Sequence, residues 1–246
     1  GPVSHALTPA TDASTVVTYH SDIVRQQTAL RFYAPLLRSF LDEVEHILVT
    51  SPRLLEHSEF LEPHHEKCTV VPLSIDPEGV VSSSQSDGEM SDGDTLVHLS
   101  IDDDEPIVLF VGRLNYYKGV EYLIDAMESV DATLLIVGEG DQREDLEERA
   151  RERGISDSVR FLGHVDDETL AGCYETADVF VLPSVEPSEA FGIVQLEAMA
   201  HEVPIVNTDL PTGVPWVTPS GETGLTVPPR DADALARAIT ELLSDD

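Results

Sequence analysis

The chain contains very little lysine and cysteine and no long apolar run. Of its 246 residues, only Lys67 and Lys118 are lysine and only Cys68 and Cys173 are cysteine. Two isolated cysteines with no Cys or His at metal spacing exclude a zinc site and fit a reducing cytoplasm. The absence of about 18 consecutive apolar residues excludes a membrane-spanning helix. No basic start followed by an apolar segment is visible, so we expect no signal peptide and a cytoplasmic location.

Acidic residues far outnumber basic ones. Lys and Arg total 14, Asp and Glu total 47, and the formal net charge is −33. A surface this acidic repels nucleic acid, because neutralisation of phosphate by cations supplies most of the affinity for it. We therefore expect no nucleic-acid partner. The composition favours adaptation to concentrated salt, where the Debye length falls to about 3 Å at 1 M and screens self-repulsion. A specific cationic partner is the alternative.

Short apolar runs alternate with helical patterns along the chain, with one interruption. This alternation predicts parallel sheets covered by helices. Residues 76–105 interrupt it with ten acidic residues and no Lys or Arg, which predicts a solvated loop or disorder. We therefore expect domains at 1–76 and 106–246, joined by an acidic linker at 77–105. The expected strands are 16–19, 47–50, 69–72, 107–112, 132–137, 159–163, 179–183, 204–207 and 224–227, and the main helices are 25–42, 120–129, 141–153, 166–176, 191–200 and 231–243.

Two cations lie five residues apart directly after the expected strand 107–112. Arg113 and Lys118 stand between Gly112 and Gly119. The carboxyl end of a parallel strand beside a helix start favours anions, because backbone N–H groups and the helix dipole point there. Arg113 offers a bidentate grip on phosphate oxygens, and Lys118 offers a compact point charge. The loop predicts a phosphate site that is not a P-loop; a surface loop with incidental charges is the alternative.

Two acids, Glu189 and Glu197, flank the start of the helix expected at 191–200. Glu197 has mostly apolar neighbours, and an acid in such company is costly unless it is hydrogen-bonded. Hydroxyls of a sugar or of a ribose would supply the donors. The backbone N–H groups of residues 190–193 would suit phosphate. The alternative is that Glu189 caps the helix and that Glu197 is hydrogen-bonded within the protein.

Three sets of residues occur in order: Gly112-Arg113 with Lys118-Gly119, the pair Glu189 and Glu197 within Glu-Ala-Phe-Gly-Ile-Val-Gln-Leu-Glu, and residues 224–229, Gly-Leu-Thr-Val-Pro-Pro. In this order they resemble family 4 of the retaining GT-B glycosyltransferases, most strongly over 105–243. The resemblance implies an α/β fold of the GT-B type. Residues 106–246 would form a Rossmann-like, doubly wound donor domain, and residues 1–76 would be the remnant of a second, acceptor-binding Rossmann-like domain.

The resemblance implies a role for each matched residue. Arg113 and Lys118 would bind the donor diphosphate and offset the charge of the leaving group. Glu189 would hold hydroxyls of the transferred hexose, and Glu197 would bind the ribose of the nucleotide. His20 would point from the acceptor domain into the cleft. Neither a metal ion nor another cofactor is implied. The remaining donor contacts, largely backbone N–H groups, would come from Gly112, Phe191, Gly192 and Ile193.

The implied reaction moves a hexose from a nucleoside-diphosphate sugar to an acceptor hydroxyl with retention. The acceptor would be a glycan, a lipid or a protein-linked glycan, with peripheral contact at the inner membrane face. The chain does not begin with Met and carries Pro72-Leu73-Ser74 where the family has Pro-Asn-Gly. The family's N-terminal glycine-rich loop is missing, so we expect an N-terminally truncated piece. A phosphorylase of this fold and a non-catalytic nucleotide-sugar-binding protein are the alternatives.

Overall fold

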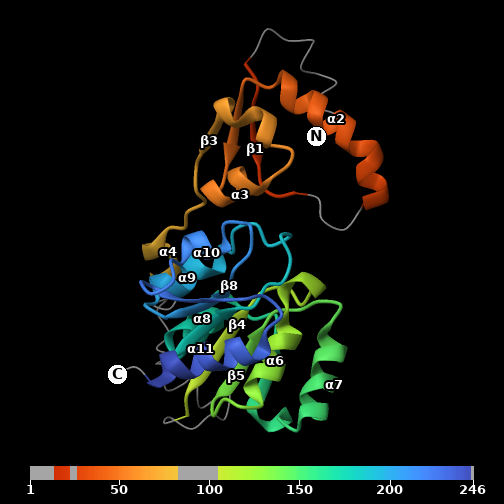
Figure 1. The fold of residues 1–246 in the computed structure, drawn as a ribbon. Coiled ribbons are helices and arrows are strands. Elements are labelled where there is room, and N and C mark those ends of the chain that lie inside the picture. The colour runs from red at the N-terminus through yellow and green to blue at the C-terminus, as the bar shows by residue number, and fades with distance from the viewer. Residues whose placement is uncertain (1–13, 23–26, 83–104, 245–246) are drawn as a thin grey trace.

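The computed structural model describes residues 14–22, 27–82 and 105–244, which form two parallel sheets with flanking helices. The smaller sheet lies over the end of the larger unit that carries helices α9 (Val194–Ala200) and α10 (Val214–Val217) (Figure 1). Among the described residues, one ion pair crosses between the two units, from Arg53 Nη2 to Asp209 Oδ1 at 2.9 Å. None of the described helices is both long and apolar enough to cross a membrane.

The smaller sheet has three strands in the order β1-β2-β3. Its strands are parallel, and residues 16–19 of β1 pair with residues 46–49 of β2. The apolar core contains Leu41, Ile47 and Leu61, each fully buried. The strands are β1 (Val16–Tyr19), β2 (His46–Val49) and β3 (Cys68–Val70), and the helices are α2 (Gln27–Glu43), α3 (Pro52–His57) and the 3-10 helix η2 (Glu62–Lys67).

One of the two lysines closes the carboxyl end of α2. Lys67 Nζ donates to the backbone oxygens of Leu41, Asp42 (3.0 Å) and Val44 (2.9 Å). The last carbonyls of a helix have no partner within the helix, and a cation there is also favoured by the helix dipole. Lys67 therefore joins η2 to the end of α2.

The larger sheet has six parallel strands in the order β6-β5-β4-β7-β8-β9. Helices cover both of its faces, so the sheet is doubly wound. The chain changes direction between the adjacent strands β4 and β7, where α/β sheets bind ligands at the carboxyl ends of the strands. The strands are β4 (Ile107–Val111), β5 (Thr133–Val137), β6 (Val159–Gly163), β7 (Val179–Leu182), β8 (Ile205–Thr208) and β9 (Gly224–Val227).

The two faces carry different helices (Figure 1). One face is covered by α6 (Val120–Met127), α7 (Arg143–Arg153) and α11 (Ala232–Ser244). The other is covered by α8 (Asp167–Glu175) together with α9. The predicted α/β fold is therefore confirmed, with a Rossmann-like doubly wound sheet and a second, smaller parallel sheet.

Two sequence-based expectations are wrong. The loop expected from residue 76 contains a helix, α4 (Pro77–Ser82), which packs against α9. Proline is favourable in the first turn of a helix. The acidic composition of the whole segment 76–105 hides the short apolar stretch that forms this helix. Residues 83–104 lie outside the described part. The helix expected at 191–200 begins only at Val194. Gly192 has a φ of +73°, in the left-handed region, and this turn conformation cannot be part of the α-helix.

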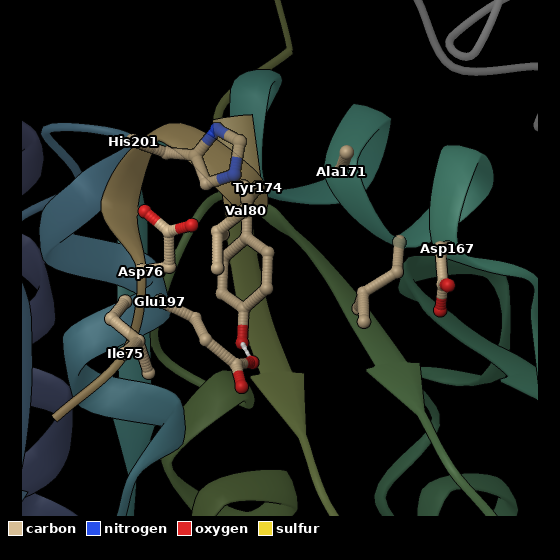
Figure 2. Close-up of a pocket in the computed structure, with 10 residues that line it drawn as sticks. Ile75, Asp76, Val80, Asp167, Ala171, Tyr174, Glu197 and His201 are labelled. Carbon is tan, nitrogen blue, oxygen red and sulfur yellow. Dashed lines mark hydrogen bonds between the residues drawn. The ribbon is translucent and has the colours of Figure 1, made fainter. Parts of the chain in front are cut away.

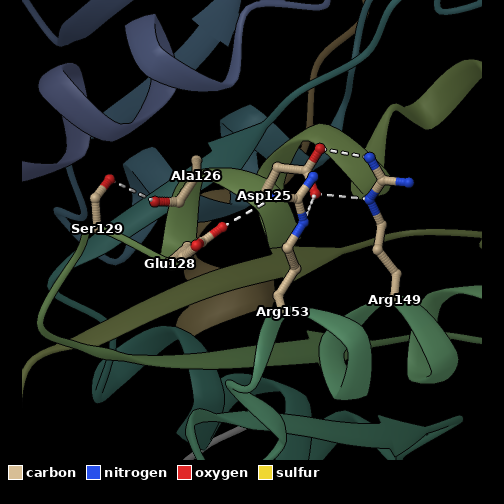
Figure 3. A network of polar contacts seen from close by, with 6 residues as sticks. All are labelled: Asp125, Ala126, Glu128, Ser129, Arg149 and Arg153. Carbon is tan, nitrogen blue, oxygen red and sulfur yellow. Dashed lines mark hydrogen bonds and ion pairs between the residues drawn. The ribbon is translucent and has the colours of Figure 1, made fainter.

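A carboxylate on α6 fastens α7 to it (Figure 3). Asp125 accepts from Arg149 through both carboxylate oxygens, at 2.7 Å for Nε, and pairs with Arg153 at 3.0 Å. The Asp125 side chain is only 14% exposed, whereas Glu128, which pairs with Arg153 at 3.1 Å, is 53% exposed. Bidentate pairs away from water are stronger than exposed ones.

We expect Asp125→Asn to lower the free energy of unfolding by about 1–3 kcal/mol, because it leaves two guanidinium groups without their shared carboxylate. The matched control Glu128→Gln removes an exposed partner and should cost about 0.5 kcal/mol or less. Urea unfolding in molar KCl measures both values. Equal losses in the two variants would contradict the assignment of the docking contact to Asp125.

Candidate functional site

A buried ion pair joins the loops that follow β4 and β7. Lys118 Nζ lies 2.6 Å from Glu189 Oε2, and the two side chains are 9% and 11% exposed. Ser184 Oγ donates to the same carboxylate oxygen at 3.1 Å. The structure therefore brings together two of the predicted site residues at the point where the sheet reverses its winding.

Close backbone contacts fix these loops against each other. Gly119 has a φ of +65°, and a Cβ there would lie 2.2 Å from the Pro183 carbonyl oxygen. Val185 N–H donates to the Tyr117 carbonyl at 2.8 Å. A Cβ on Gly112 would lie 3.3 Å from Lys118 Nζ. Larger residues at either glycine would displace the lysine or separate the loops.

The second predicted cation stands apart from this pair. Arg113 is exposed, and its guanidinium group has no ion-pair or hydrogen-bond partner among the described residues. Lys118, by contrast, is neutralised by Glu189. Because Arg113 keeps its charge available, the loop after β4 still offers a positive group to an anion at the cleft.

The turn at residues 190–193 presents unused donors. Within the described chain, the N–H groups of Gly192 and Ile193 donate to no protein acceptor. Ile193 is 40% exposed, and Phe191 is buried with its ring 6.3 Å from that of Trp216. Two free N–H groups beside a cationic loop can receive an anionic or hydroxyl oxygen.

Glu197 stands at the wall of a cavity of about 420 Å³ between α8, α9 and residues 75–80 (Figure 2). Tyr174 donates its hydroxyl proton to Glu197 Oε2 at 2.9 Å. The Tyr174 ring stacks on His201, with centroids 5.3 Å apart and planes 8° from parallel. Glu197 is half-buried and already has one donor. The sequence did not single out Tyr174, because it comes from another helix.

His20 lies in the other unit. It is exposed and follows β1 directly. No contact joins it to Lys118 or Glu189 in the described chain. Its loop is held by Asp22, which accepts from the Tyr19 hydroxyl at 2.6 Å and from Ser58 Oγ at 2.7 Å. No group of His, Cys, Asp and Glu side chains in the described ranges is arranged to hold a metal ion.

Comparison with known proteins identifies this arrangement. Residues 95–246, more than half of the chain, match the family model described as Glycosyl transferases group 1. The chain belongs to this family. It is 36% identical over 235 residues to D-rhamnosyltransferase WbpZ of Pseudomonas aeruginosa, covering 96% of this chain and 59% of that protein. It is 33% identical over 240 residues to O-antigen chain mannosyltransferase C of Escherichia coli, covering 98% and 62%.

The similarity extends to solved structures of glycosyltransferases. Sucrose-phosphate synthase from Thermosynechococcus elongatus superimposes with a TM-score of 0.79 and 31% sequence identity, over 99% of this chain and 62% of that one. The chain thus spans about three fifths of the length of these relatives. The family and the fold follow directly from these matches.

Burial lowers the pKa of His201, against the opposing influence of Glu175 and Glu197, and burial also lowers the pKa of His64. The unfolded chain therefore binds more protons than the folded chain as the pH falls through about 6.5. We expect the free energy of unfolding to be highest above that pH and to decline below it. His201→Gln should make this decline shallower in urea titrations between about pH 7 and 5. An unchanged slope in His201→Gln would contradict the expectation.

Proposed function

We propose that this chain carries the donor-binding machinery of a retaining glycosyltransferase, which moves a hexose from a nucleoside-diphosphate sugar to an acceptor hydroxyl. The observation that supports it most directly is the buried Lys118–Glu189 pair at 2.6 Å, set between the loops after β4 and β7. A cation for phosphate and a carboxylate for hydroxyls are thereby held side by side. The relatives named as a rhamnosyltransferase and a mannosyltransferase support a hexose.

The diphosphate would lie across Arg113, Lys118 and the free N–H groups of Gly192 and Ile193, beside Gly112. Negative charge grows on the departing phosphate as the bond to the sugar breaks, and positioned cations and N–H donors stabilise it most at that stage. Lys118 has three protons to donate, so its contact with Glu189 leaves others for phosphate oxygens.

The sugar and the nucleoside would occupy opposite sides of the diphosphate. Glu189 would accept from hexose hydroxyls, and its fixed contacts with Lys118 and Ser184 make it a positioning group. Glu197 would accept from ribose hydroxyls, so the cavity beside it would receive the nucleoside. Phe191 would present backbone groups to the sugar.

Residues 1–76 would contribute one wall of the acceptor side, with His20 facing the sugar, and residues 106–246 would form the donor domain. The acceptor oxygen attacks the anomeric carbon on the face from which the phosphate departs, so the configuration is retained. On that face the hydroxyl proton can pass directly to the departing phosphate oxygen. The acceptor would be a glycan or a lipid- or protein-linked glycan, met by peripheral contact with the membrane.

The test is calorimetric titration of the chain with UDP, GDP and ADP in molar KCl. We expect one nucleotide to bind with micromolar affinity and Lys118→Met to weaken it by about tenfold to a hundredfold, through loss of a charge-assisted contact. Lys67→Met removes the chain's other lysine, at the end of α2, and should leave the affinity unchanged. The single tryptophan, Trp216, packs near Phe191 and gives an independent fluorescence signal of binding.

A folded wild-type chain that binds none of the three nucleotides would overturn the proposed donor site. Equal weakening by Lys118→Met and Lys67→Met would show that the effect comes from stability and not from contact with phosphate. Unfolding curves for both variants identify that case.

A further inference from the structure

A buried amide side chain lies directly beneath the turn at residues 190–193. Gln195, on α9, is fully buried. Its Nε2 donates to the Phe191 carbonyl at 3.1 Å and to the Val214 carbonyl at 3.3 Å, and it lies 3.4 Å from the Gly192 carbonyl oxygen. One amide group therefore holds two successive carbonyls of the turn and one of α10.

The opposite end of the amide fixes which way it faces. Gln195 Oε1 accepts from Asn207 Nδ2 at 2.9 Å and from Thr218 Oγ1 at 3.0 Å. Asn207 Oδ1 in turn accepts from Thr226 Oγ1 at 2.8 Å. Rotating the amide by half a turn would set donors against donors and carbonyls against an oxygen. The orientation of Gln195 is thus set by β8, by β9 and by the segment after α10.

The geometry of the peptide bond means that carbonyls pointing inward to Gln195 are paired with N–H groups pointing outward. In a trans peptide the C=O and N–H bonds point in opposite directions, and the described chain has no cis peptide bonds. Because the Phe191 carbonyl points inward to Gln195, the N–H of Gly192 in the same peptide points away from it. The Gly192 carbonyl, which also accepts from the Gln195 backbone N–H at 2.9 Å, likewise sends the N–H of Ile193 outward. Both of these N–H groups lack a protein acceptor within the described chain.

We infer that Gln195 is a positioning residue for the donor phosphate, acting through the turn whose N–H groups it directs toward the cleft. The inference rests on the proposed function, because the phosphate is what those N–H groups would bind. Gln195 lies among Val194, Leu196 and Ala198, where an apolar side chain would avoid the cost of burying an amide. The cost of burying the Gln195 amide is offset by its hydrogen bonds to the carbonyl oxygens of the turn and of α10.

The test uses Gln195→Met, which keeps the length of the side chain and removes its donors. We would measure the affinities of UDP, GDP and ADP and of the corresponding nucleosides by displacement, following Trp216 fluorescence in molar KCl. The expected result is that the preference for the diphosphate over its own nucleoside falls about tenfold, while the nucleoside affinity is unchanged. The control Thr133→Val removes a buried hydroxyl on β5, outside this network, and should keep the preference.

Each outcome decides the inference. A folded Gln195→Met chain with an undiminished diphosphate preference overturns it, and so does an equal loss of both affinities, which would mean a merely structural role. If Gln195→Met does not fold, Thr218→Val replaces it, since that change removes one of the two donors that orient the amide; a partial loss supports the inference and no loss overturns it. A wild-type chain without any diphosphate preference would instead overturn the proposed function itself, and the inference with it.

Discussion

The arrangement of the candidate site depends on one buried ion pair. Lys118 and Glu189 lie on separate loops, and each would be an uncompensated buried charge without the other. Their contact explains why the loops after β4 and β7 meet so closely that a Cβ on Gly119 would overlap the Pro183 carbonyl. It also sets the chemistry, because an entering phosphate shares the ammonium group with a carboxylate that is already in place.

The acidity of the chain makes its few cations informative. Neither lysine is a surface residue of the usual kind: Lys67 closes the end of α2, and Lys118 is buried against Glu189. Arginines such as Arg149 and Arg53 are engaged by carboxylates. Arg113, whose exposed side chain has no partner in the described chain, follows β4 on the same loop as Lys118 and is therefore placed to meet a phosphate there.

Most of the architecture could be predicted from the sequence, because buried parallel strands are continuous apolar runs separated by helical patterns. The loops of Arg113, Lys118 and Glu189 could also be placed, since they follow such strands. Contacts between distant elements could not. The short helix α4 owes its place to packing on α9, and Glu197, expected among apolar side chains, receives its proton donor from Tyr174 on α8.

The hydrogen bonds of Gln195 are a second example of contacts that the sequence could not predict. Its position within an apolar stretch of α9 suggests only an exception to the helical pattern. Its partners come from β8, from the segment after α10 and from the turn before α9. Periodicity reports which side of a helix is buried and carries no information about which buried oxygen meets which donor.

The contact of α4 with α9 has a mechanical consequence. Residues 75–80 connect the smaller sheet toward the larger unit and at the same time form part of the wall of the cavity beside Glu197. A shift of this segment changes the shape of the cavity, so a molecule that fits one shape better must favour the matching position of the segment. Any motion of the smaller sheet that moved residues 75–80 would therefore be thermodynamically coupled to occupation of the cavity.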